Sequence, residues 1–165
     1  MKPYSIVLGV VAFLAFCTAA VAMPGFIPQR WQMRQKWSTI GQLPRHQMVR
    51  DHGVPVPYAA MTNPLPKSRA TLRRGGIIYA QQCQSCHGAK GQGNGPEGLK
   101  LTPHPGDLAW LSEMQISQSD CFLYWTIAEG GAPVSSPMPA FRNSLTPEEI
   151  WSLSAYIQAR LPIRR

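Results

Sequence analysis

Acidic side chains are scarce in this sequence. Aspartate and glutamate together number 8 among 165 residues, against 16 lysines and arginines, and the formal net charge is +8. Acid/base catalysis by carboxylates needs such groups placed as a working pair. Asp107 is expected in a turn, and Glu148 and Glu149 are expected to cap a helix. The acidic residues therefore do not indicate a carboxylate active site.

Cysteine is also rare: the chain has four, and only Cys83 and Cys86 stand close together. A structural zinc site would need two further ligands at matched spacing, whereas Cys17 and Cys121 are isolated from this pair and from each other. A thioredoxin-like redox pair would need a βαβ setting, and no strand pattern surrounds these cysteines. For Cys121 we expect a buried thiol on the core side of a helix, with an intermolecular disulfide as the alternative.

The first apolar run, Ile6–Cys17, is short for a membrane span, which needs roughly 20 residues. Lys2 precedes it and Ala20-Val21-Ala22 follows it, which is the pattern of a secretory signal peptide. We therefore predict a signal peptide at residues 1–22 and a mature chain that starts at Met23. An uncleaved membrane anchor is the alternative.

The sequence does contain one informative motif, Cys83-Gln84-Ser85-Cys86-His87. C-x-x-C-H is the attachment pattern of c-type haem. Its two thiols add across the vinyl groups, and the adjacent histidine gives an imidazole nitrogen to the iron. The sequence thus predicts one covalent haem c on Cys83 and Cys86, with His87 as an iron ligand. Covalent attachment in bacteria resembles a periplasmic assembly process, so the motif agrees with export to the periplasm.

A haem with one histidine ligand can bind a second protein ligand, and a thioether there raises the reduction potential. Met138 is the best candidate, because two prolines stiffen its loop in Ser136-Pro137-Met138-Pro139-Ala140-Phe141. Met114 lacks such bracing, and His104 would give a bis-histidine haem of lower potential. Both stay open as alternatives, and so does a role for Met138 as core filler.

The positive charge is concentrated before the motif. Residues 24–74 hold nine basic residues against Asp51 alone, whereas residues 75–165 hold six basic and seven acidic residues. Seven prolines between residues 23 and 68 interrupt any long helix. We therefore predict an irregular basic arm at 23–68, called the arm below, followed by a haem domain at 69–165.

The arm has little core of its own, so it either wraps the haem domain or awaits a partner. The acidic surface of a redox protein, or anionic lipid at a membrane, fits its charge, and a solvated flexible segment is the alternative. Nucleic acid is not expected, given export and the lack of a recognisable binding module. A short amphipathic helix fits residues 29–40. Copper binding by His46, Met48 and His52 is a further alternative.

Helical signals dominate the haem domain, and no substantial sheet is expected. A first helix should run from about Ala70 into the motif. A middle helix should span roughly Gln118–Glu129, capped by Ser117 and Asp120 and stopped by Gly130-Gly131.

The final helix has the clearest start. Thr146 is expected as its cap, Pro147 at its first position and Glu149 as the partner in a capping box. Apolar residues then recur at helical spacing on one face: Ile150, Leu153, Ile157 and Leu161.

A wider set of residues shares the pattern of one family: Gly76, Tyr79, Cys83, Cys86, His87, Gly88, Gly91, Gly93, Gly95, Pro96, Pro105, Asp107, Leu108, Gly130, Gly131, Met138, Pro139, Ala140, Phe141, Trp151 and Tyr156. On these residues the segment 74–162 resembles a class I cytochrome c of the small bacterial kind. The resemblance implies an all-α fold of three main helices around one haem, with the first and last crossing near Gly76 and Tyr156. It also implies that a proline carbonyl, here Pro96, orients the His87 ring.

We therefore expect a periplasmic one-electron carrier that is not an enzyme and whose partners are redox proteins. If His87 and Met138 fill both axial positions, no open position is left for a substrate. A dedicated haem subunit of a larger periplasmic or membrane oxidoreductase, docked through the arm, is the alternative. A haem sensor or peroxidase-like enzyme with an open sixth position is the third hypothesis.

Overall fold

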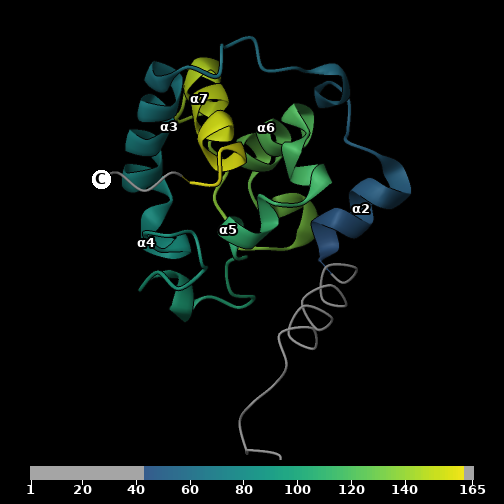
Figure 1. Ribbon diagram of the computed structural model, residues 1–165. Coiled ribbons are helices and arrows are strands. Elements are labelled where there is room, and N and C mark those ends of the chain that lie inside the picture. The colour runs from purple at the N-terminus through teal and green to yellow at the C-terminus, as the bar shows by residue number, and fades with distance from the viewer. Residues whose placement is uncertain (1–42, 162–165) are drawn as a thin grey trace, which may run out of the picture. The chain divides into compact units, whose positions relative to one another are not determined.

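The computed structural model describes residues 43–161, which fall within one compact unit, Thr39–Arg165. Helices and loops make up this part of the chain, and it contains no strand (Figure 1). The all-α prediction is thus confirmed. The predicted signal peptide and the helix predicted at 29–40 lie outside the described residues. Within the described range, no helix is both long enough and apolar enough to cross a membrane.

Three helices form the centre of the haem domain: α3 (Arg69–Gln82), α6 (Asp120–Glu129) and α7 (Pro147–Gln158). Helices α3 and α7 lie side by side (Figure 1). A Cβ built on Gly75 would lie 2.1 Å from the Ser152 carbonyl oxygen, so no side chain fits between the two backbones. Gly76 faces the Tyr156 ring. The predicted crossing is confirmed, with Gly75 as its tightest point.

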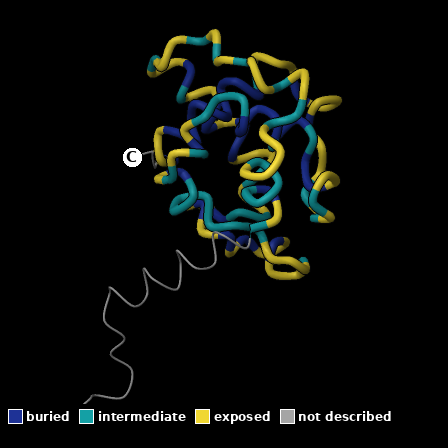
Figure 2. The backbone as a smooth tube through the Cα atoms, turned by 90° about the vertical axis from the view of Figure 1, so that its right-hand side faces the viewer, coloured by how far each residue is buried: buried dark blue, intermediate teal, exposed yellow. Residues whose placement is uncertain are grey.

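Large side chains from these three helices fill the interior. Trp125, Tyr79, Ile150 and Leu153 are each at most 2% exposed. The backbone around them is buried, with exposed loops outside it (Figure 2). Removing this apolar surface from water, at about 25 cal/mol per Å², is the main term that holds the helices together.

Shorter helical segments precede the main helices or connect them. In chain order they are α2 (Pro44–His52), the 3-10 turn η1 (Tyr58–Ala60), α4 (Gln84–His87), the 3-10 turn η2 (Gly98–Lys100), α5 (Leu108–Leu111), and the 3-10 turns η3 (Gln115–Gln118) and η4 (Ala132–Val134).

The predicted N-terminal cap is confirmed for α7 but is wrong for α6. At α7, the Thr146 side chain accepts from the Glu149 N–H and the Glu149 carboxylate accepts from the Thr146 N–H, which is the predicted capping box. At α6, the helix begins at Asp120 without a side-chain cap. Ser117 is instead buried within η3. Because Ser117 is part of this 3-10 turn, it does not cap α6 as the sequence pattern predicts.

The arm is more regular than its prolines suggest. Residues 44–52 form α2, so the prediction of an irregular arm is wrong there. Pro44 stands in the first turn of the helix, where its missing N–H costs no hydrogen bond. Gly53 ends the helix with a φ of 75°. Several arm side chains then pack against the core: Met48, Val49, Val54, Tyr58, Met61 and Leu65. The described part of the arm, residues 43–68, therefore wraps the haem domain.

Polar contacts hold the arm as well. The Asn63 N–H donates to the Asp120 carboxylate at 2.9 Å, and its side-chain amide donates to the Trp151 carbonyl at 3.0 Å. The Tyr58 hydroxyl donates to the Glu129 carboxylate. These bonds join the arm to both ends of α6 and to the middle of α7.

Candidate haem-binding site

The C-x-x-C-H motif lies where α3 passes into α4. The Cys83 N–H donates to the Tyr79 carbonyl at 2.9 Å, and the His87 N–H donates to the Cys83 carbonyl at 2.8 Å. Gly88 ends the turn with a φ of 79°. One short helical segment therefore carries both cysteines and the histidine at the end of α3.

A cavity of about 300 Å³ lies beside this turn. Cys83, Cys86, His87 and Met138 all line it, so the structure brings the four predicted haem-binding side chains together. Much of the remaining lining is apolar: Leu101, Pro103, Pro105, Pro137, Pro139 and Phe141. Such a wall suits a flat apolar macrocycle, and small-molecule pockets span about 300–1,000 Å³. The residues present therefore fit a haem.

The His87 ring is oriented by a backbone carbonyl. Its Nδ1 lies 3.2 Å from the Gly106 carbonyl oxygen. Because a carbonyl can only accept, Nδ1 carries the proton and Nε2 keeps the lone pair that can bind a metal. The hydrogen bond thus fixes the tautomer that an iron ligand needs.

The assignment of Pro96 as the partner of His87 is wrong. The residues on either side of Pro96 are hydrogen-bonded to the motif itself: the Gly95 N–H donates to the Cys86 carbonyl and the Glu97 N–H to the Ser85 carbonyl. This pairing holds Pro96 at an exposed position that does not line the cavity. The loop returns to the His87 ring only later, at Gly106.

Burial sets the protonation of these groups. Desolvation lowers the pKa of His87, with the Gly106 hydrogen bond acting in the opposite direction, and so favours the neutral imidazole that ligates metals. Burial, with a smaller contribution from Cys86, raises the pKa of Cys83 to about 12. The Cys83 thiol of the folded chain is thus protonated at neutral pH, its less reactive form.

The backbone of Met138 is fixed by the end of α6. In the Met138 loop, residues 135–140, the Met138 carbonyl accepts from the Gly131 N–H at 2.7 Å. The Ser136 N–H donates to the Gly131 carbonyl at 3.0 Å. Gly130 has a φ of 61°, and a Cβ there would lie 2.3 Å from the Pro139 carbonyl oxygen. The loop is therefore pressed against the two glycines that end the helix.

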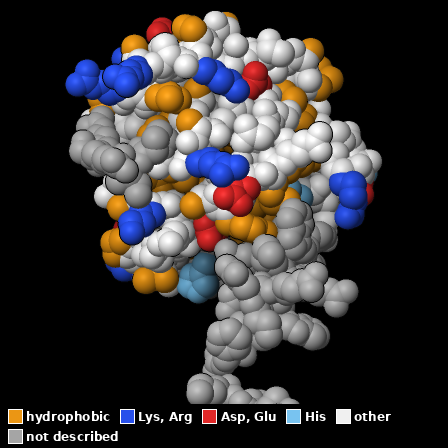
Figure 3. Space-filling view, viewed as in Figure 1, with side chains coloured by type: hydrophobic (Ala, Val, Ile, Leu, Met, Phe, Trp, Pro, Cys, Tyr) orange, Lys and Arg blue, Asp and Glu red, His pale blue; other side chains and the backbone are white. Residues whose placement is uncertain are grey.

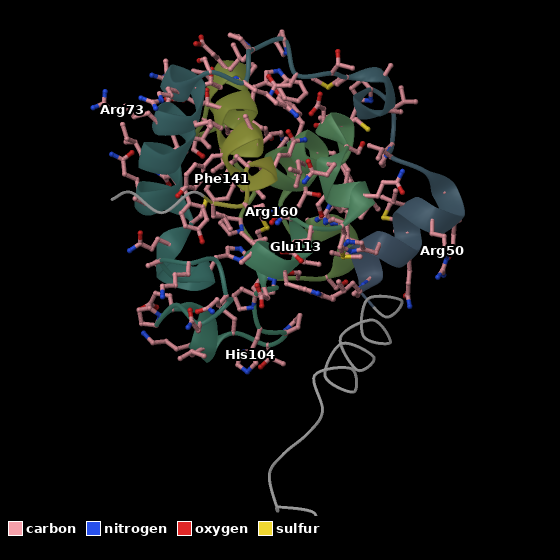
Figure 4. All side chains as sticks on the ribbon, in the orientation of Figure 1. Arg50, Arg73, His104, Glu113, Phe141 and Arg160 are labelled. Atoms are coloured by element: carbon pink, nitrogen blue, oxygen red, sulfur yellow. The ribbon has the colours of Figure 1, made fainter. Side chains whose placement is uncertain are left out.

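The two alternative ligands differ in their placement. Met114 does not line the cavity. His104 does line it, but its side chain is exposed, and its Nδ1 lies 3.3 Å from the Gly98 carbonyl oxygen (Figure 4). Met138 is half-buried and its backbone is hydrogen-bonded. The structure thus favours Met138 over His104 and gives no support to Met114.

The sequence pattern did not indicate Gly106, because a backbone carbonyl has no side-chain signature. A second supporting contact could have been found: Tyr79 lies one turn before Cys83, and its hydroxyl donates to the Gly88 carbonyl at 2.7 Å. This bond ties α3 to the residue that follows His87. Tyr79 and Gly106 therefore hold the motif from its two sides.

The other soft side chains stay apart. The His46 ring packs against Phe122 with centroids 5.4 Å apart, and His52 is exposed. In the part of the chain that the structure describes, no three His, Cys, Asp or Glu side chains form a group that could hold a metal. The copper alternative therefore gains no support.

Cys121 is a half-buried thiol whose sulfur lies 3.1 Å from the Ser119 hydroxyl oxygen.

The segment that builds this site also matches a protein-family model. The family is described as cytochrome c oxidase, cbb3-type, subunit III, and the match covers residues 70–157. The chain belongs to this family of c-type cytochromes. The family implies a haem cofactor, in agreement with the cavity and its donor set. The resemblance to a class I cytochrome c is thus confirmed.

Among solved structures, the cytochrome is similar to a chain of the reducing HAO-like protein complex from Kuenenia stuttgartiensis. The two chains share 25% sequence identity and superpose with a TM-score of 0.51. The similarity covers 70% of this chain and 55% of that chain, so the cytochrome spans little more than half the length of this relative. A search of the curated proteins gave no match.

Gly130→Ala should destabilise the cytochrome more than Gly53→Ala. Both glycines end a helix at positive φ, which costs an alanine about 1–2 kcal/mol. A Cβ at Gly53 meets nothing within 4 Å, whereas one at Gly130 meets the Pro139 carbonyl. We expect Gly130→Ala to lower the free energy of unfolding by about 1–3 kcal/mol more than the control, measured by urea denaturation. Equal losses would show that the Met138 loop is not pressed against Gly130.

Proposed function

We propose that this cytochrome carries single electrons in the periplasm through one covalently bound haem c, with His87 and Met138 as iron ligands. The observation that supports this most directly is the shared cavity, which Cys83, Cys86, His87 and Met138 all line. The haem would supply a ferric/ferrous couple, and the protein would set its potential through ligands, burial and hydrogen bonds.

Each of these side chains has a separate task in the proposal. Cys83 and Cys86 tether the cofactor from one short helical segment. His87 offers a neutral imidazole whose orientation is set by Gly106. Met138 offers a thioether, which favours the reduced iron and raises the potential. With both axial positions filled, no site is left for a substrate, so the proposed role is a carrier rather than a catalyst.

The positive charge of the chain favours redox partners with acidic docking surfaces. However, fewer basic residues of the arm are free to bind such a partner than the sequence suggests. Arg45 is buried, and Arg50 pairs with Asp51 at 2.9 Å. On the face in Figure 3, Lys and Arg side chains are scattered, some beside Asp or Glu. Exposed cations lie at the start of α3, among them Lys67 and Arg73, which points outward (Figure 4). An acidic partner would meet the molecule there.

A dedicated haem subunit of a larger oxidoreductase is the second candidate. Two observations favour it: the matching family is described as an oxidase subunit, and the structural relative belongs to a protein complex. Residues 43–68 pack on the haem domain, so docking through this part of the arm would have to use its outward-facing side chains.

Intact-mass spectrometry of the protein from a periplasmic fraction tests attachment and export together. We expect the mass of a chain that starts at Met23 plus one haem. A Cys83→Ser/Cys86→Ser double variant should lose its haem on denaturation, because no thioether holds it. Haem that leaves the denatured native protein, or native protein found only in the cytoplasm, would contradict the proposal.

Met138→Ala should abolish the far-red sulfur-to-iron absorption band of the oxidised protein and lower its reduction potential, because the thioether is lost. Met114→Ala and His104→Ala are the matched controls and should retain both properties. Survival of the band in Met138→Ala would show that another residue is the ligand. Rapid carbon monoxide binding by the reduced native protein would favour the sensor hypothesis instead.

A tagged cytochrome purified from a membrane extract should distinguish a shuttle from a subunit. A shuttle elutes at a monomeric volume without a stoichiometric partner, whereas a subunit keeps its partner through purification. Because residues 43–68 pack on the haem domain, deleting the arm would disturb the fold. Lys67→Glu with Arg73→Glu is the sharper variant, and it should weaken binding to an acidic partner most at low salt. Unchanged binding would exclude this docking surface.

A further inference from the structure

A buried cation from the arm reaches the end of α6. Arg45 of α2 is 9% exposed, and its Nη2 donates a hydrogen bond to the Gly130 carbonyl. The guanidinium also lies over the Trp125 ring, 4.3 Å from the ring centroid. The last carbonyls of a helix carry partial negative charge and lack partners within the helix. Arg45 therefore binds the C-terminal end of α6 by charge and by hydrogen bond.

This arrangement is costly for a side chain whose only role is stability. Desolvation lowers the pKa of Arg45 to about 10, although the nearby Glu129 carboxylate acts to raise it. Its second terminal nitrogen, Nη1, is buried and has no hydrogen-bond partner among the described residues. Even buried ion pairs can often be replaced by apolar groups without loss of stability, and the best attested benefit of keeping a buried ionic group is conformational specificity. The question is then which conformation Arg45 specifies.

One peptide group lies between Arg45 and the Met138 loop. The Gly130 carbonyl that accepts from Arg45 and the Gly131 N–H that donates to the Met138 carbonyl at 2.7 Å belong to the same planar unit. A hydrogen bond to the oxygen polarises the amide and strengthens the bond made by its N–H. It also fixes the plane, and with it the direction in which the N–H points. Arg45 is thus one rigid group away from the backbone of Met138.

The rest of the arm keeps α2 in place. The Tyr58 hydroxyl donates to the Glu129 carboxylate, which also binds Arg142 beyond the Met138 loop. Asn63 holds the arm at the opposite end of α6 through Asp120. The position of Arg45 is therefore set by the fold rather than by the side chain alone.

We propose that Arg45 is a positioning residue for the sixth iron ligand: it fixes the Gly130–Gly131 peptide plane, which holds the Met138 loop in its ligating position. This rests on the proposed ligation by Met138. Removal of Arg45 should leave the haem attached and the helices folded but should weaken the hold of the Met138 sulfur on the iron.

Imidazole titration of the oxidised protein measures how strongly Met138 binds the iron, because added imidazole competes with Met138 for the sixth position. Arg45→Met should bind imidazole about tenfold more tightly than the native protein, which corresponds to about 1.4 kcal/mol. Its reduction potential should fall and its far-red band should weaken. Arg45→Lys, which can still donate to Gly130 and lie over Trp125, should recover most of the native behaviour. Should Arg45→Met not fold, Arg45→Leu, which also lacks a donor, is judged by the same criteria.

Two controls separate positioning from general loosening. Arg50→Met removes an exposed arginine from the same helix, where Arg50 points away from the domain (Figure 4). Asn63→Ala removes the arm's side-chain hydrogen bond to the Trp151 carbonyl of α7, far from the Gly130–Gly131 peptide. Both should leave imidazole affinity and potential at native values. If Asn63→Ala matches Arg45→Met, the arm as a whole is responsible and the positioning role is overturned.

The two proposals can fail separately. If the native protein lacks the far-red band, Met138 is not the ligand, and both the ligation and the role of Arg45 fall. If the native protein shows the band but Arg45→Met keeps native imidazole affinity and potential, only the role of Arg45 falls.

Discussion

The backbone of α3 touches the backbone of α7 at Gly75 and Ser152, and the haem site depends on that contact. With no side chain between them, the two helices have one separation and one crossing point. Helix α3 then runs two turns further and ends at Gln82, directly before Cys83. Tyr79 packs on Tyr156 of α7 and donates to the Gly88 carbonyl, so α7 also governs the direction in which the motif leaves α3.

The Met138 side of the cavity is positioned by α6. Gly130 and Gly131 end that helix and hold the Met138 loop through backbone bonds. Helices α3 and α6 both pack on α7. Helix α7 therefore positions the motif through α3 and the Met138 loop through α6. The cavity between them is thus a product of helix packing. The end of α3 fixes one side of the cavity and a hydrogen-bonded loop fixes the other, which leaves little freedom for the distance between His87 and Met138.

The sequence was informative where a local pattern decides the structure. The capping box at Thr146, the motif at Cys83–His87 and the proline-braced Met138 each depend on residues a few positions apart. It was misleading at Ser117, where a 3-10 turn competes with capping, and at Pro44, which begins a helix instead of breaking one. The roles of Gly106 and Arg45 could not be predicted. One is a backbone carbonyl, and the other meets a partner 85 positions away.

The contacts between the arm and α6 have a consequence for the order of assembly. Arg45 and Gly130 are 85 positions apart, Tyr58 and Glu129 are 71 apart, and Asn63 and Asp120 are 57 apart. Contacts that close such long loops form once the intervening chain is already compact. We therefore expect the arm to dock after the helices between it and α6 have packed. The wall of the cavity that carries Met138 is therefore complete only when the arm has docked on α6.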